Sequence, residues 1–245
     1  MEAPNLLETG VAAMVLAAAF LIGERTRILG RLLTPRSFTS FGGGMAAAYV
    51  FLHVMPELHG ARHAFTEAAA MALPYEGKAI YYLALAGFLS FYGIRHFHAS
   101  QLKRATDGKP SRLDFQVQIG GFAAYAWLMG YLLLRGLEAH HAAIGLYAAA
   151  MSFHCLAINR ELSHEYGNDY RRSGRFLLAG MALVGWASAA LLDLPASLIP
   201  LLLAFLSGAV IMNSLILELP TEKDGRFWPF LTGGLLYGLI LLPLG

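Results

Sequence analysis

The chain has 245 residues, of which 57% are hydrophobic and 14% are charged, with a formal net charge of +2 and one cysteine. Its mean hydropathy is +0.53. A soluble domain of this length needs more polar surface, so the composition predicts an all-α integral membrane protein. The single Cys155 excludes an intrachain disulfide framework and a zinc module built from several cysteines. The small net charge gives no reason to expect a nucleic acid partner.

Eight apolar stretches bounded by charged residues follow one another along the chain, each near the roughly 20 residues that cross a hydrocarbon core. They cover residues 6–23, 38–55, 79–94, 115–134, 142–158, 176–192, 196–217 and 227–244. The first ten residues contain no Lys or Arg, so we expect no cleavable signal peptide and a first stretch that is kept as a helix. The sequence therefore predicts one transmembrane domain over residues 1–245, built as a bundle of eight helices.

The basic residues alternate between the two sides of this predicted bundle. Fifteen of the 18 Lys and Arg lie in the connections after the first, third, fifth and seventh stretches. By the positive-inside rule these connections are cytoplasmic and both termini lie on the non-cytoplasmic side. The connection 95–114 is polar and contains Gly108 and Pro110, which predicts a mobile cytoplasmic loop. We expect the protein to reside in the plasma (inner) membrane.

The end of the second stretch carries a candidate cation site. His53 and Glu57 are four residues apart, so both lie on one face of a helix and can reach one divalent cation. The predicted orientation places them at the external mouth, as an entrance pair. The alternative is a solvated pair without a function. Further outer groups are interpreted as solvated rim residues: His59, His63 and Glu67, and His140 with His141.

The fifth stretch carries one histidine near mid-depth, His154. A neutral imidazole at that depth needs a hydrogen bond, a proton path or a metal ion, because unpaired polar groups are costly in lipid. The sequence leaves a structural histidine and a metal ligand equally open.

At the inner end of the same stretch, Glu161, His164 and Glu165 occupy positions i, i+3 and i+4 of a helix. This spacing can bind a cation, with His96 and His98 nearby if the loops bring them there. The alternative is an interface of salt bridges with the neighbouring arginines.

Two segments resemble the ZIP family of divalent metal transporters. FLHVMPE at 51–57, preceded by small residues, is similar to the second helix of that family, and GAVIMNSLILELP at 208–220 is similar to a late helix. The eight stretches, the outward termini and the histidines between the third and fourth stretches also match. The resemblance covers nearly the whole chain. It implies a ZIP-like bundle that moves zinc or a related divalent cation as its substrate by alternating access. The partners it implies are the lipid bilayer, the metal ion and a second copy of the chain in a homodimer.

The metal-binding core of the family is altered in this chain. The family motifs HNxxDG and HExPHE align with YAWLMG at 125–130 and HCLAIN at 154–159, where only Gly130 and His154 agree. The resemblance therefore implies an altered midplane site, in which a soft or borderline cation meets His154, Cys155, Met129 and Asn159. Carboxylates that would neutralise a dication are replaced at these positions.

Two functions follow from these patterns. The first is transport of a divalent cation, along a route from His53 and Glu57 past His154 to Glu161 and His164. The second is a non-transporting ZIP-fold membrane protein with an interaction or regulatory role, which the loss of the midplane carboxylates favours. An intramembrane hydrolase needs several deep histidine or aspartate ligands. The sequence offers one deep histidine and no deep aspartate, so we expect no enzyme.

Overall fold

The structure is a computed structural model that describes residues 6–22, 35–68, 76–105, 109–135, 141–214 and 226–241. Within these ranges the regular secondary structure is helical and no strand is present, which confirms the predicted all-α fold. The helical elements are α1 (Leu6–Ile22), α2 (Pro35–Tyr49), η2 (Val50–Val54), α3 (Met55–Ala68), α4 (Glu76–Arg104), α5 (Arg112–Arg135), α6 (His141–Asp169), η3 (Tyr170–Gly174), α7 (Arg175–Leu191), α8 (Leu198–Asn213) and α9 (Phe227–Leu241). The basic connections after the first and seventh predicted stretches lie largely outside the described residues, as do residues 23, 215–217 and 242–244 of the stretches themselves.

The second apolar stretch belongs to a continuous helix over residues 35–68, with a wider π-helical turn in its middle. In η2 the backbone N–H of Met55 donates to the carbonyl of Val50, five residues back. Pro56 follows directly and has no N–H to donate, so the regular hydrogen-bond ladder is interrupted at this point. The wider turn contains His53, one of the predicted cation ligands.

The prediction of a mobile loop over 95–114 is wrong for most of its length. Helix α4 continues to Arg104, and α5 begins at Arg112 after Pro110. Charged residues end an apolar stretch but do not end a helix, because Arg and Lys are good helix formers. The Ser111 hydroxyl accepts the backbone N–H of Asp114 at 3.1 Å and so caps the start of α5.

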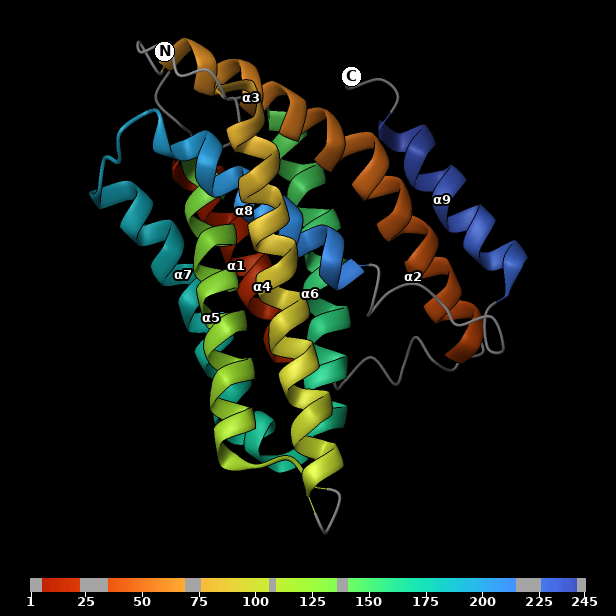
Figure 1. The fold of residues 1–245 in the computed structure, drawn as a ribbon. Coiled ribbons are helices and arrows are strands. Elements are labelled where there is room, and N and C mark those ends of the chain that lie inside the picture. Colours follow the sequence, from red (N-terminus) through yellow and green to blue (C-terminus); the bar gives the residue numbers. More distant parts are fainter. Residues whose placement is uncertain are drawn as a thin grey trace.

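A second helical extension follows the fifth apolar stretch. Helix α6 runs to Asp169, and its regular course is broken at Gly167, where φ is 52°. This left-handed conformation is accessible to glycine at little cost. The chain turns there from α6 through η3 into α7, as Figure 1 shows at the lower end of the bundle.

Three pairs of helices are in direct backbone contact: α2 with α9, α4 with α8, and α5 with α7 (Figure 1). Each pair uses one glycine from each helix, and a Cβ on that glycine would collide with a backbone carbonyl of the partner. The glycine and carbonyl partners are Gly44 with Phe230, Gly233 with Phe41, Gly87 with Phe205, Gly208 with Ala84, Gly130 with Ala182, and Gly185 with Trp127. In each pair, the residue whose carbonyl one glycine contacts lies three positions before the other glycine of that pair. These glycines therefore allow the close approach of all three helix pairs.

The pairs α2·α9 and α4·α8 are built from the same sequence pattern. Phe41 and Gly44 of α2 correspond to Phe205 and Gly208 of α8, each a Phe-x-x-Gly segment. Figure 1 shows that α2 and α8 run in opposite general directions. Helix α5 packs against α4 and α8, and α6 packs against α2, while α8 also contacts η2 and α3 directly.

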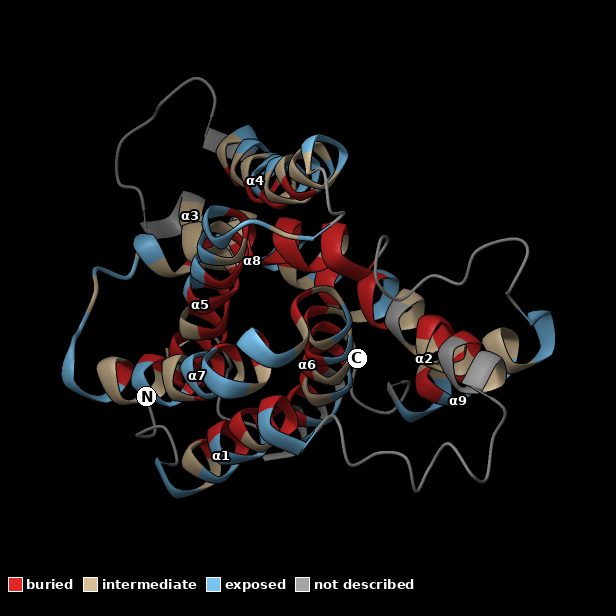
Figure 2. Ribbon diagram, turned by 90° about the horizontal axis from the view of Figure 1, so that it is seen from below, coloured by how far each residue is buried: buried red, intermediate tan, exposed pale blue. Residues whose placement is uncertain are grey.

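The outward faces of the bundle are rich in large apolar side chains. Leu7, Phe51 and Trp228 are 78%, 65% and 72% exposed, and buried residues lie on the inward faces of the helices (Figure 2). Within the described part of the chain, two helical runs are long and apolar enough to cross a membrane: α5, and the run from Tyr147 to Leu191 through the break at Gly167. Helices α1, α8 and α9 are apolar but shorter. Apolar outward faces are typical of helices in contact with lipid.

Two glycines of α5 provide a matched test of the backbone contacts. We expect Gly130→Ala to lower the free energy of unfolding by roughly 1–3 kcal/mol, because its Cβ collides with the carbonyl of Ala182. Gly120 faces open space, so Gly120→Ala should be neutral or stabilise by up to about 1 kcal/mol through helix propensity. Melting temperatures of the two variants in detergent measure the difference. Equal melting temperatures of Gly130→Ala and Gly120→Ala would contradict the close contact between Gly130 and the Ala182 carbonyl.

Candidate functional site

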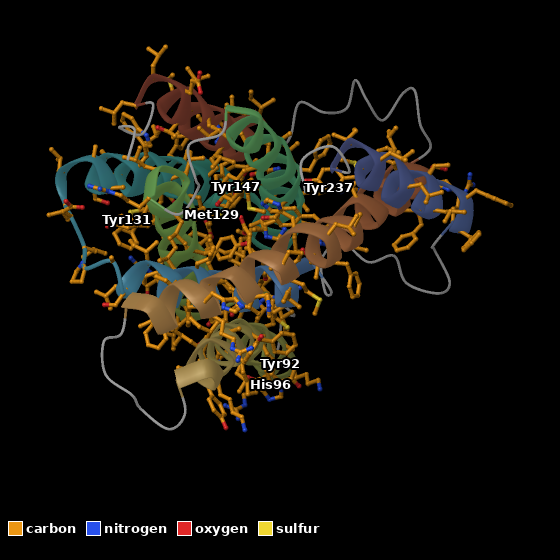
Figure 3. All side chains as sticks on the ribbon, turned by 90° about the horizontal axis from the view of Figure 1, so that it is seen from above. Tyr92, His96, Met129, Tyr131, Tyr147 and Tyr237 are labelled. Carbon is orange, nitrogen blue, oxygen red and sulfur yellow. The ribbon has the colours of Figure 1, made fainter. Side chains whose placement is uncertain are left out.

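Polar and titratable side chains gather at three levels of the bundle. An outer pair lies on the helix over 35–68, a middle pair joins α5 to α6, and an inner cluster joins α4, α5 and α6. In Figure 3, Met129 and Tyr147 lie in the interior between the helices, whereas Tyr92 and His96 lie on the outer side of α4. The predicted site residues belong to these three groups, and the first group contacts α6, because the Tyr49 ring lies beside His53 and the Tyr49 hydroxyl donates to the Met151 Sδ at 3.9 Å.

The outer pair forms as its spacing predicts. The His53 Nε2 lies 3.2 Å from the Glu57 Oε1, and the side chains are 20% and 25% exposed. The His53 ring also contacts the buried Tyr49 ring, with 5.2 Å between the centroids. Within the neighbouring rim group, the Nε2 atoms of His59 and His63 lie 3.3 Å apart, and both residues are exposed. The side chains of Glu67, His140 and His141 lie outside the described residues.

The middle pair is a buried hydrogen bond between Tyr125 and His154. The Tyr125 hydroxyl lies 2.7 Å from the His154 Nε2, and the two residues are 1% and 3% exposed. These residues occupy the positions that the ZIP resemblance aligns with the first residues of its two metal-binding motifs. The imidazole thus has the hydrogen-bond partner that a structural histidine requires.

The other predicted midplane residues are buried on the same two helices. Met129, Cys155 and Asn159 are each at most 2% exposed. On a regular helix Cys155 and Asn159 share a face with each other, and His154 lies on a neighbouring face. Among the described residues, no three His, Cys, Asp or Glu side chains are placed to hold a metal ion.

The first part of the inner cluster surrounds the buried Asp114. Its Oδ2 lies 2.7 Å from the His98 Nδ1 and accepts the hydroxyl of Tyr166 at 2.9 Å. Asp114 is fully buried and its Oδ1 has no hydrogen-bond partner. One carboxylate therefore connects α4, α5 and α6.

The second part of the inner cluster is centred on Arg95 of α4. Its guanidinium donates to the Glu165 Oε1 at 3.0 Å and to the Glu161 Oε1 at 3.2 Å. The Glu165 Oε1 also lies 3.5 Å from the His98 Nε2. Glu161 thus belongs to a salt-bridge interface, which was the alternative interpretation of this helix end.

Burial governs the titration of two residues in this cluster. It raises the pKa of Glu165 above the usual carboxyl value, although the nearby Arg95 and His98 act in the opposite direction. Burial and then the Asp114 carboxylate raise the pKa of Tyr166, so its hydroxyl keeps its proton and acts as a donor. Proton binding by Glu165 is therefore linked to folding.

His164 lies apart from the carboxylates of the predicted trio. It is exposed and lines a cleft of about 630 Å³ between the start of α5 and the break in α6. Glu165, Tyr166 and Gly167 line the same cleft. His164 and Glu161 therefore face different surroundings, and the trio does not act as one site.

Sequence reasoning missed Asp114 and Arg95, which are central to the inner cluster. Both lie in the stretch that was predicted to be a loop. One available signal was the segment Ser111-Arg112-Leu113-Asp114, whose ends have the spacing of a helix N-terminal capping box. A helix beginning there would have placed Asp114 on α5.

Comparisons with protein-family models, with curated proteins and with solved structures give no match for this chain.

The hydrogen bond of the middle pair can be tested by Tyr125→Phe. The variant leaves the buried Nε2 of His154 without this partner, so we expect the free energy of unfolding to fall by about 1–3 kcal/mol. Tyr82→Phe is the matched control, because Tyr82 is 64% exposed. Thermal melting in detergent is the measurement. A Tyr125→Phe protein as stable as the control would refute a structural role of the bond.

The raised pKa of Glu165 predicts a pH dependence of stability. A carboxyl whose pKa is raised by folding contributes stability below its ordinary pKa, near 4.5, and this contribution is lost as the pH rises through the folded pKa. We therefore expect Glu165→Gln to reduce the fall in melting temperature as the pH is raised from about 4.5. Glu161→Gln, whose side chain is 36% exposed, is the control and should change the profile less. A Glu165→Gln profile parallel to that of the wild type would contradict the assignment.

Proposed function

We propose that this protein is a polytopic membrane protein that crosses the bilayer with eight helices in a ZIP-like bundle and transports a divalent cation by alternating access. The observation that carries the proposal is the position of the buried Tyr125–His154 pair. It joins α5, which packs against α4 and α8 of one similar pair, to α6, which packs against α2 of the other. In many transporters the substrate site lies near the midplane, where two structural repeats meet.

The membrane assignment is supported by the outward faces and by the charge distribution. Exposed apolar side chains cover the outer surface of the helices, and Lys and Arg alternate between the two ends of the bundle along the sequence. Several of the predicted crossings are short or interrupted within the described residues. Local thinning of the bilayer accommodates a short helix, and tilting accommodates a long one.

The proposed route begins at the outer pair His53 and Glu57 and continues to His154 at the middle level. Because the Tyr125 hydroxyl is bonded to the His154 Nε2, a cation can reach this nitrogen only after the hydroxyl moves away. The middle pair would then act as a gate that closes when the site is empty. At the inner end, Arg95 links α4 to the carboxylates of α6 and must release them if these helices separate.

Uptake into proteoliposomes tests the transport proposal. We expect flux of zinc, iron, manganese or cadmium above that of empty liposomes, with a loss of about tenfold in His154→Ala, which corresponds to about 1.4 kcal/mol of lost cation binding. The matched control is His96→Ala, because His96 is exposed on α4. Absence of flux for all four ions, or equal flux in the His154→Ala protein, would overturn the proposal.

A second function is favoured by the same hydrogen bond. If the Tyr125–His154 pair is a permanent structural contact, the protein is a non-transporting ZIP-like membrane protein with an interaction or regulatory role. Metal content and zinc-dependent melting temperature separate the two functions, because a ligand that binds the folded state raises the melting temperature. Zinc that is bound stoichiometrically by the wild type and lost in His154→Ala supports transport. Failure of zinc to stabilise either the wild type or Tyr125→Phe supports the second function.

A further inference from the structure

Two exposed histidines of α3 meet through their ring nitrogens. The Nε2 of His59 lies 3.3 Å from the Nε2 of His63, which follows one helical turn later. The ring centroids are 5.0 Å apart and the ring planes cross at 77°, so the rings meet at their nitrogen-bearing edges rather than by stacking. The sequence predicts only a solvated rim at this point, whereas the structure brings two metal-ligating nitrogens together.

The separation of these two nitrogens matches the spacing of two ligands on one metal ion. Zinc binds imidazole nitrogens at about 2.0–2.1 Å, and a tetrahedral angle between two such bonds places the nitrogens about 3.3–3.4 Å apart. A hydrogen bond between the rings is the alternative, but 3.3 Å is long for it, because N–H donors lie at about 2.7–3.2 Å from oxygen acceptors. Histidines at positions i and i+4 of one helix also bind zinc in metalloproteases.

The packing of α3 fixes the backbone that carries this pair. Leu58 and Ala61, which are sequence neighbours of the histidines, are 8% and 5% exposed and belong to a buried cluster with Ile80 of α4 and Ala204 of α8. Helix α3 contacts both of these helices directly. A fixed backbone reduces the entropy that is lost when two side chains are ordered around an ion.

We propose that His59 and His63 form a binding site for a divalent transition-metal ion, such as Zn²⁺, on the surface of α3. Both rings then carry their proton on Nδ1 and direct their Nε2 lone pairs to the ion. Among the described residues no third His, Cys, Asp or Glu side chain is placed to join them, so water completes the coordination and the ion can exchange. Imidazole ligands favour zinc, copper or nickel over magnesium and calcium.

This site lies on a different face of the helix from the outer pair. Because a helix turns by about 100° per residue, His59 and His63 lie about 200° and 240° around α3 from Glu57. Both histidines are exposed, whereas the side chains of His53 and Glu57 are 20% and 25% exposed. The site therefore requires no ion on the proposed route and is independent of the transport proposal.

Zinc binding to the full chain in lipid nanodiscs, measured by calorimetric titration at pH 7.5, tests the proposal. We expect His59→Ala and His63→Ala each to bind one zinc equivalent at least about tenfold more weakly than the wild type. His154→Ala should keep this equivalent, so failure of the transport proposal is distinguishable from failure of this one. The matched control is His96→Ala, because His96 is exposed on α4. Equal zinc binding in the wild type and both α3 variants, or none in the wild type, would overturn the proposal.

A spacing variant separates this site from independent binding by single surface histidines. Gly60→His combined with His63→Ala keeps two histidines but places them about 100° apart on the helix. A Cβ on Gly60 meets open space, so this protein should fold. We expect its zinc affinity to match that of His63→Ala. Wild-type affinity in the spacing variant would show that the histidines do not act as a pair and would overturn the proposal.

Discussion

Direct contact between helix backbones holds this bundle together. In the lipid environment that we propose for this protein, lipid tails are as apolar as the helix surfaces, so burial of apolar side chains alone gives helices little reason to associate. Six glycines solve this problem by bringing three pairs of helices close enough for extensive van der Waals contact. The arrangement of α5 and α6 depends on these contacts. Gly130 and Gly185 fix α5 against α7, and the Tyr125–His154 hydrogen bond joins α6 to α5.

Within that frame, two sets of buried polar groups pair with one another. The Tyr125–His154 bond connects α5 to α6, and Asp114 connects α4, α5 and α6 through His98 and Tyr166. Such contacts are specific because an unpaired polar group in a low-dielectric interior is costly. The polar contacts fix which helices meet, and the inner cluster does so with groups whose charge can change.

The candidate site illustrates what residue spacing can predict. His53 and Glu57 meet because four residues are one turn of a helix, and this local rule holds wherever the helix forms. Glu161, His164 and Glu165 have an equally suitable spacing, yet two of them bind Arg95 while His164 is exposed beside a cleft. Their partners lie about 70 residues away in the sequence, so spacing within one helix could not reveal them.

The sequence alone predicted the all-helical fold that the described residues adopt, because its apolar stretches are long and its charged residues lie mostly between them. Only the tertiary structure decided that α4 extends to Arg104, that Tyr125 closes on His154, and that Asp114 and Arg95 join the inner cluster. The physical reason is that helix formation depends on neighbours in the chain, whereas a buried polar group depends on whichever residue the packing of distant helices brings within hydrogen-bond distance.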